Sequence, residues 1–197
     1  MSGLSAAADL LILNLLTLVC CIPIITAGAA ITAMNDRCIH LVRQEGGNIV
    51  SGFFRAFRAN FKKGTILGLI VLAAAVLLYF DYLAAQSTIP VFRIGITAIS
   101  ILALAVTEYA FALLARYENT LRNTIKNAAV LSVAWFPRTL LMVMFTIGFW
   151  LAGIVFVQLA TPVMLMFALS LPCYVCSLLM RGIFDSIEKG DFDEEQK

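Results

Sequence analysis

Charged side chains are scarce in this chain of 197 residues. Lys, Arg, Asp and Glu together make up 13% of the sequence, and hydrophobic residues make up 61%. Roughly a quarter of the residues of a soluble domain are charged, so a water-soluble fold of this composition could not hide its apolar surface. The composition therefore predicts a protein embedded in lipid. In such a protein the placement of charges matters more than the net charge of +2.

The sequence also lacks the residue patterns of most catalytic and metal sites. His40 is the only histidine, and a single imidazole cannot build a histidine-based metal site. The sequence contains no glycine-rich phosphate loop, and no serine has a plausible base near it in sequence. We therefore expect no enzymatic activity, no metal and no cofactor, with His40 as a solvated or interfacial side chain.

The cysteines do not form the pattern of a disulfide framework. Four of the five lie inside apolar runs, and Cys38 lies at a basic junction. This placement favours buried thiols that act as small hydrophobic side chains. Cys173 and Cys176 form a C-x-x-C pattern, but a membrane thiol oxidoreductase would need a second cysteine pair, and the predicted external loops contain none.

Long apolar runs are what the sequence has in abundance. The first, residues 9–34, contains no basic residue and is long enough to cross a hydrocarbon core of about 30 Å. It lacks the basic region of a signal peptide, so we expect it to be retained as a span. The predicted spans are 9–34, 65–84, 92–114, 139–158 and 162–180. We predict an all-α fold, a polytopic helical bundle within one membrane domain (1–188), followed by a disordered acidic tail (189–197).

Pro23 interrupts the first predicted span, and Thr26 and Gly28 follow it closely. A proline inside a helix removes one hydrogen bond and clashes with the preceding turn. The span is therefore kinked, or broken into two short helices. A kink packed against neighbouring helices is the simpler interpretation. The alternative is a half-helix end directed at a ligand, as in some transporters.

Two amphipathic helices are predicted between the spans. In residues 49–64, phenylalanines fall on one face and basic residues on another, which suits a helix lying in the membrane interface. The alternative is a helix packed under the bundle with its charges solvated. A weaker helix of the same kind follows the third span. The candidate contacts to anionic lipid head groups or a protein partner are Arg55, Arg58, Lys62, Lys63, Arg122 and Lys126. Nucleic acid is not an expected partner, because these basic residues serve topology first.

The basic residues alternate between the predicted connectors. From the N-terminus to the C-terminus the six connectors and termini carry 0, 6, 1, 4, 0 and 3 of them, when Arg93 at the very start of the third span is counted with the connector before it. With five spans, the positive-inside rule predicts an external N-terminus and a cytoplasmic C-terminus. A re-entrant first segment would overturn this topology.

Glu108 is the acidic residue that lies deepest within a predicted span. An ionisable residue inside a membrane span is a functional hypothesis by default. One interpretation is a proton- or cation-coupled site, with Asn14, Thr17 or Tyr109 nearby. The other is a carboxylate paired to a cationic partner that locks the bundle.

Three stretches, at 9–34, 53–68 and 115–141, resemble the bacterial YesL-like family. The string N-L-L-x-L-x-C-C-x-P-x-x-T-x-G-A-A-x-T-A-M, Asn14 to Met34, carries the most specific part, and the resemblance extends over about residues 4–188. It implies an integral protein of the bacterial cytoplasmic membrane with no assigned catalytic or binding residues. Genes of this family often lie beside carbohydrate ABC importer components.

Two functions follow as hypotheses. The first is a non-enzymatic accessory protein that contacts an ABC importer permease or a membrane sensor through its cytoplasmic connectors. The second is a small transporter or channel, functioning as a homo-oligomer, with a polar path near Pro23 and Glu108.

Overall fold

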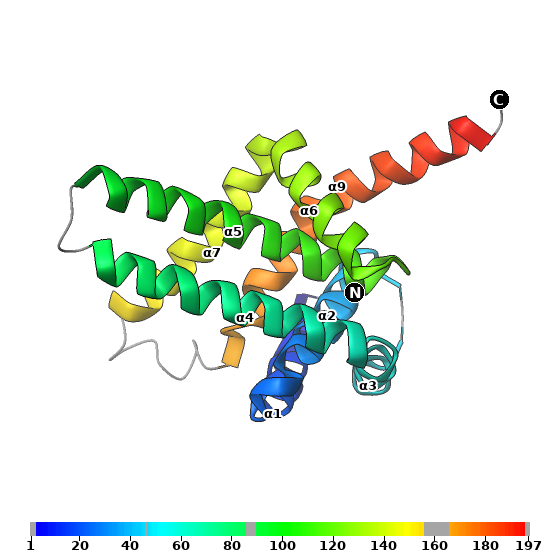
Figure 1. The fold of residues 1–197 in the computed structure, drawn as a ribbon. Coiled ribbons are helices and arrows are strands. Elements are labelled where there is room, and N and C mark those ends of the chain that lie inside the picture. Colours follow the sequence, from blue (N-terminus) through cyan, green and yellow to red (C-terminus); the bar gives the residue numbers. More distant parts are fainter. Residues whose placement is uncertain (1–2, 46, 86–89, 156–165, 196–197) are drawn as a thin grey trace.

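The computed structural model describes residues 3–45, 47–85, 90–155 and 166–195, and within these ranges the regular structure is entirely helical (Figure 1). This agrees with the predicted all-α fold. The elements are α1 (Gly3–Cys21), the 3₁₀ turn η1 (Ile24–Thr26), α2 (Ala27–Val42), α3 (Ile49–Ala59), α4 (Phe61–Ala84), α5 (Pro90–Arg116), α6 (Leu121–Ala134), α7 (Phe136–Val155) and α9 (Ser170–Glu195).

Among the described residues, three helices are long and apolar enough to cross a membrane: α4, α5 from Val91 onward, and α7. They overlap the predicted spans 65–84, 92–114 and 139–158. Almost all of α4 is exposed, since only Gly64 and Leu67 of this helix are buried. An apolar helix with so little protein around it presents a surface that suits lipid. The predicted loop between the fourth and fifth spans falls in residues 156–165, outside the described residues.

The first predicted span is not one helix. α1 ends at Cys21, and Pro23 adopts an extended conformation with φ −77° and ψ 114° before η1 begins. The Thr26 hydroxyl donates to the Cys20 carbonyl at 2.6 Å and lies 2.9 Å from the Pro23 carbonyl. These bonds satisfy carbonyls that the broken helix would leave without partners. The segment is therefore fully broken, and the simpler interpretation of a kink is wrong.

α1 and α2 form an antiparallel hairpin around this break (Figure 1). Leu10 and Leu13 of α1 share a buried cluster with Cys38 and Leu41 of α2, so the start of α1 lies against the end of α2. The external N-terminus predicted above assumed that residues 9–34 form a single crossing helix, and these residues do not form one helix. The sidedness of insertion stays a prediction.

The backbones of α2 and α4 touch at three glycines. A Cβ atom added to Gly28 of α2 would lie 2.2 Å from the Gly64 carbonyl oxygen and 2.7 Å from Gly68 Cα. Gly64 and Gly68 are four residues apart, which places both on one face of α4 in the G-x-x-x-G arrangement of close membrane helix pairs. Any larger side chain here would push the two helices apart.

α3 packs across α2 and does not lie free beside the bundle. Gly52, Phe53 and Ala56 form its buried face, and the Asn48 side chain caps its start by accepting from the Val50 and Ser51 amides. Phe54 and Phe61 remain exposed at 41% and 43%. Arg55 and Arg58 are exposed as well, so a helix in the membrane interface and a helix packed under the bundle both stay predictions.

α5 and α9 meet in the largest buried cluster, which includes Tyr109, Leu113, Met180, Ile183 and Phe184. α9 then continues as a helix to Glu195 and projects away from the bundle (Figure 1). Composition predicted a disordered tail from residue 189, whereas the helix runs through most of that segment. Its Glu and Lys residues are good helix formers, which gives the physical reason.

We expect Gly28→Ala to destabilise the protein. The added methyl group would overlap the α4 backbone, and overpacking of this kind costs about 1–3 kcal/mol. Thermal unfolding of the detergent-solubilised protein, followed by size-exclusion chromatography after heating, measures the loss. Gly148→Ala is the matched control, because a Cβ at Gly148 meets nothing within 4 Å. Equal melting temperatures for the two variants would contradict the close α2–α4 contact.

Candidate functional site

A pocket of about 430 Å³ lies among α2, α4, α5, α7 and α9. Most of its wall is apolar, and it contains one carboxylic acid, Glu108 of α5. The other polar or thiol-bearing side chains on its wall come from Asn35, Thr107, Thr146, Cys173 and Cys176. The structure thus places the ionisable residue that the sequence singled out beside a pocket and not in a solid core.

One of the two carboxyl oxygens of Glu108 is hydrogen-bonded, and the other is not. Thr146 of α7 donates its hydroxyl proton to Glu108 Oε1 at 2.6 Å. Glu108 Oε2 is buried and has no hydrogen-bond partner among the described residues. A buried polar atom without a partner costs about 1–3 kcal/mol, so this oxygen is a favourable position for a hydrogen-bond donor or a cation.

No ion pair among the described residues includes Glu108. The sequence left two interpretations open, and one of them required a cationic partner that locks the bundle. The described part of the chain instead gives Glu108 a hydroxyl from a neighbouring helix. Thr146 itself was not predicted, because a single threonine in an apolar run carries no sequence signal of its own.

The polar residues predicted to accompany Glu108 lie elsewhere. Asn14 is fully buried, and its Oδ1 accepts from the Leu169 and Ser170 amides at 3.0 and 3.4 Å. Thr17 donates to the carbonyl of Leu13 within its own helix. Asn14 therefore caps the start of α9 from a different helix, which satisfies amides that a helix start leaves without partners.

Tyr109 also points away from the pocket. Its hydroxyl lies 3.1 Å from Thr139 Oγ1, and the ring is fully buried in the core. Adjacent residues on a helix face different directions, so its position next to Glu108 in sequence does not bring the two side chains to one site.

Residues that follow the predicted helix break form part of the wall of the Glu108 pocket. Ile24, Ala27 and Gly28 line the pocket, whereas Pro23 and Thr26 do not. Cys173 and Cys176 also line it, and both are free thiols. Cys38, Cys173 and Cys176 are buried, which agrees with their predicted role as small hydrophobic side chains. The described residues contain no group of three His, Cys, Asp or Glu side chains that could hold a metal ion.

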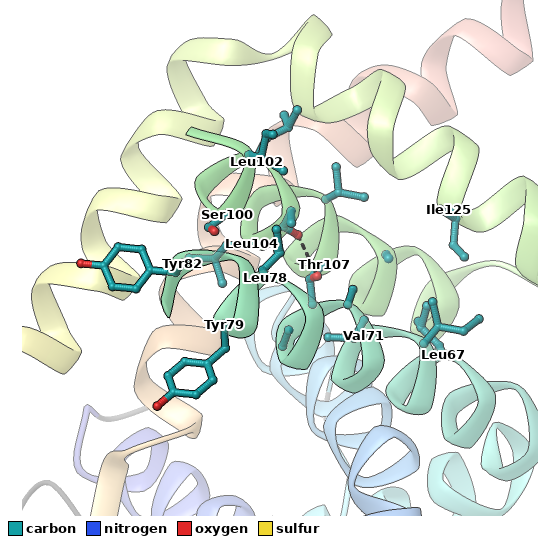
Figure 2. A pocket seen from close by; sticks show the side chains of 17 residues that line it. Leu67, Val71, Leu78, Tyr79, Tyr82, Ser100, Leu102, Leu104, Thr107 and Ile125 are labelled. Carbon is teal, nitrogen blue, oxygen red and sulfur yellow. Dashed lines mark hydrogen bonds between the residues drawn. The ribbon is translucent and has the colours of Figure 1, made fainter. Parts of the chain in front are cut away.

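A second pocket, of about 650 Å³, follows the exposed side of α4 and α5 (Figure 2). The hydroxyl groups of Ser100 and Thr107 are already used within α5, since Ser100 donates to the Ile96 carbonyl and Thr107 donates to the Ala103 carbonyl. The rest of the wall is apolar or aromatic, with Tyr79 and Tyr82 at one end. A groove of this kind on an exposed helix pair suits lipid chains and offers little to a polar ligand.

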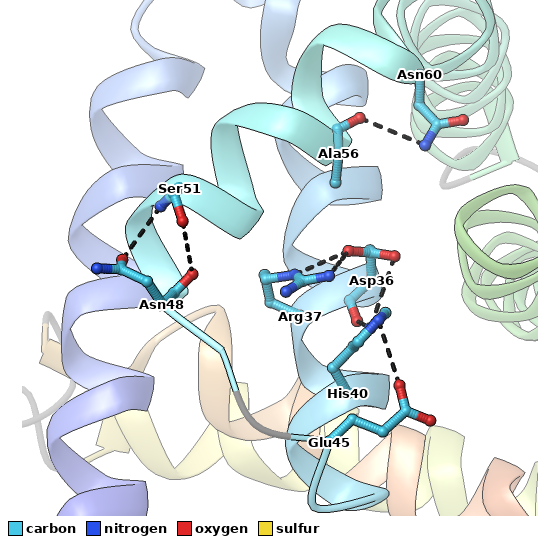
Figure 3. A network of polar contacts seen from close by, with 8 residues as sticks. All are labelled: Asp36, Arg37, His40, Glu45, Asn48, Ser51, Ala56 and Asn60. Atoms are coloured by element: carbon cyan, nitrogen blue, oxygen red, sulfur yellow. Dashed lines mark hydrogen bonds and ion pairs between the residues drawn. The ribbon is translucent and has the colours of Figure 1, made fainter.

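A network of polar contacts lies at the C-terminal end of α2 (Figure 3). Arg37 donates from Nε and Nη2 to Asp36 Oδ2 at 2.8 and 2.5 Å. His40 Nδ1 lies 2.8 Å from the Asp36 carbonyl oxygen, to which this nitrogen donates, and His40 Nε2 lies 3.3 Å from Glu45 Oε2. His40 therefore makes specific contacts, although the sequence predicted a solvated or interfacial side chain for it.

The fold and the composition define an all-α membrane protein. Residues 10–82 match the family described as "Protein of unknown function, DUF624". This match covers less than half of the chain, from α1 to the last turn of α4. No curated protein and no solved structure was found to match the chain.

We expect Asn14→Leu to destabilise the protein by about 1–3 kcal/mol, because the first amides of α9 would lose a buried acceptor. Thermal unfolding in detergent measures this change. Thr17→Val serves as the control on the same helix. Its hydroxyl bonds only a carbonyl of its own helix, so the expected loss is below about 1 kcal/mol. Similar losses in both variants would mean that the cap contributes little.

Proposed function

We propose that this chain is an integral membrane accessory protein that contacts a partner through the basic side chains at one end of the bundle. The observation that carries this proposal is a set of exposed cations on two neighbouring parts of the fold. They are Arg55, Arg58, Lys62 and Lys63 at the α3–α4 junction, and Arg122 and Lys126 on α6.

Four of these cations are available for a partner. Arg58 and Lys62 form no ion pair with the described residues, and neither do Arg122 and Lys126 on α6. Charged groups that remain unpaired in the folded chain favour association with anionic surfaces, including lipid head groups. The opposite end of α4 and α5 carries a single basic residue, Arg93, so the asymmetry points to one face of the membrane.

The partner class comes from the resemblance to the YesL-like family. Its gene neighbourhoods favour a carbohydrate ABC importer permease or a membrane sensor of a bacterial cytoplasmic membrane. Gene proximity is an association and not a mechanism. The scarcity of catalytic groups supports a non-enzymatic role but names no partner.

We expect charge reversal at Arg55, Arg58 and Lys62 to release the partner. Affinity purification of the tagged protein from native membranes, with quantitative mass spectrometry, should recover a permease or sensor in stoichiometric amount with the wild type. Recovery should fall by at least about tenfold with Glu at the three positions, because complementary charge would become repulsion.

Arg93→Glu is the control for this experiment. It reverses one charge at the other end of the α4–α5 pair and should leave recovery unchanged. Recovery of the same proteins in the same amounts by the triple variant would exclude the basic surface as the contact.

The pocket at Glu108 favours a second candidate function, a small transporter that works as a homo-oligomer. A buried carboxyl oxygen without a partner, inside a pocket bounded by five helices, suits transient binding of a proton or cation. The break at Pro23 brings the start of α2 to the same pocket.

We expect Glu108→Gln to abolish any such activity. Protein-loaded liposomes with an entrapped pH-sensitive dye report proton flux under an imposed gradient. The wild type should exceed empty liposomes, and Glu108→Gln should fall by at least about tenfold if the carboxyl group carries the ion. Glu118→Gln removes an exposed carboxylate just after the same helix and should retain the wild-type rate. Wild-type liposomes no faster than empty ones would exclude proton transport.

A further inference from the structure

A third pocket, of about 400 Å³, lies at the basic end of the bundle and differs from the other two in being mainly polar. Three separate parts of the chain form it: the end of α2, the α3–α4 junction, and the end of α5 with the residues after it. Its charged or ionisable side chains are Asp36, Arg37, His40, Arg55, Lys63, Arg116 and Glu118.

The charges in this pocket do not balance. Four of its side chains are permanently cationic (two from α2 and α3, two from α4 and α5) and two are carboxylates, which leaves an excess of two positive charges before His40 is counted. Asp36 is already engaged by Arg37 through two hydrogen bonds. Arg55 makes no hydrogen bond or ion pair with the described residues.

The pocket is held in place by contacts that do not depend on a ligand. Arg37 is 6% exposed, and its guanidinium lies so close to Gly52 of α3 that a Cβ there would meet Nη1 at 2.3 Å. Lys63 donates from Nζ to the Asn119 carbonyl at 3.1 Å, which links the start of α4 to the segment after α5. Arg37 and Lys63 are therefore held in place by the fold, which lowers the entropy that a ligand must overcome to order these two side chains.

We propose that this pocket binds a phosphate ester. A phosphate group carries one or two negative charges and accepts several hydrogen bonds, which matches the excess of cationic side chains on the pocket wall and the planar donors of Arg55. The small side chains of Ala56, Ala59 and Ala115 on the wall leave room for it. The same chemistry is supplied by the head group of an anionic phospholipid and by a free phosphate or a soluble phosphate ester.

The experiment uses the full chain in detergent and two double variants of equal charge. Arg55→Gln with Lys63→Gln removes two cations from the pocket wall. Arg93→Gln with Arg181→Gln removes two exposed cations that lie outside both the pocket and the proposed partner surface. Native mass spectrometry with added phosphatidylglycerol, compared with phosphatidylcholine, tests the lipid source. Melting temperature with inorganic phosphate, compared with chloride at equal ionic strength, tests the soluble source.

We expect the wild type and the Arg93/Arg181 variant to bind at least one probe alike, and the Arg55/Lys63 variant to bind it at least about tenfold more weakly. Preference for phosphatidylglycerol alone would assign the lipid head group, and a rise in melting temperature with phosphate would assign the soluble ester. Equal weakening in both double variants would overturn the proposal, since it would show only general charge attraction. Failure of both probes to bind the wild type would also overturn it.

Ala59→Glu provides a second test of the pocket in case the Arg55/Lys63 variant does not fold. It adds a negative charge to the pocket wall and removes no described contact, so it should weaken binding without lowering the melting temperature measured in the absence of ligand. Arg55 and Lys63 belong both to this pocket and to the proposed partner surface, whereas Arg58 and Lys62 belong to that surface alone. Partner recovery with Arg58→Glu and Lys62→Glu, without a change at Arg55, therefore tests the partner proposal separately from the pocket.

Discussion

The direct contact between the backbones of α2 and α4 sets the position of most of the fold. Gly28, Gly64 and Gly68 leave no side chain between the two helices, so their separation is fixed by the main chain itself. α2 also contacts α1, α3, α5 and α9. Because association of helices in lipid depends on close packing more than on a hydrophobic driving force, a contact of this kind is an effective way to place a central helix. The Glu108 pocket and the basic pocket both have α2 in their walls.

The break before α2 depends on the same contact. Pro23 ends α1, and Thr26 supplies hydrogen bonds to carbonyls that the break leaves open. These local interactions permit a break but do not set the direction in which the chain continues. The chain turns back because α2 has a surface for α4 on one side and a surface for Leu10 and Leu13 of α1 on another. A kinked, continuous helix could not make both contacts.

The sequence was most informative where local composition determines structure. Apolar length predicted α4, α5 and α7 to within a few residues, and the alternation of aromatic and basic residues predicted α3. It was least informative where distant residues meet. Nothing near Asn14 indicates that it caps α9, and nothing near Thr146 indicates that it donates to Glu108, because both partners lie far away in sequence. Proline signalled a break but not the antiparallel hairpin, since that outcome depends on tertiary packing.

Two of the acidic groups that border these pockets, Asp36 and Glu108, differ in how well the fold satisfies them. Asp36 accepts two hydrogen bonds from Arg37 beside the solvent-accessible end of α2, so its negative charge is already paired within the fold. Glu108 receives one hydroxyl, and its second oxygen is buried without a described partner. Native proteins rarely retain such an atom unless something else satisfies it. A glutamine or a leucine would be easier to bury at this position than Glu108. The presence of the carboxyl group is therefore the strongest structural argument that its pocket receives a ligand. This argument does not depend on whether the basic end contacts a protein.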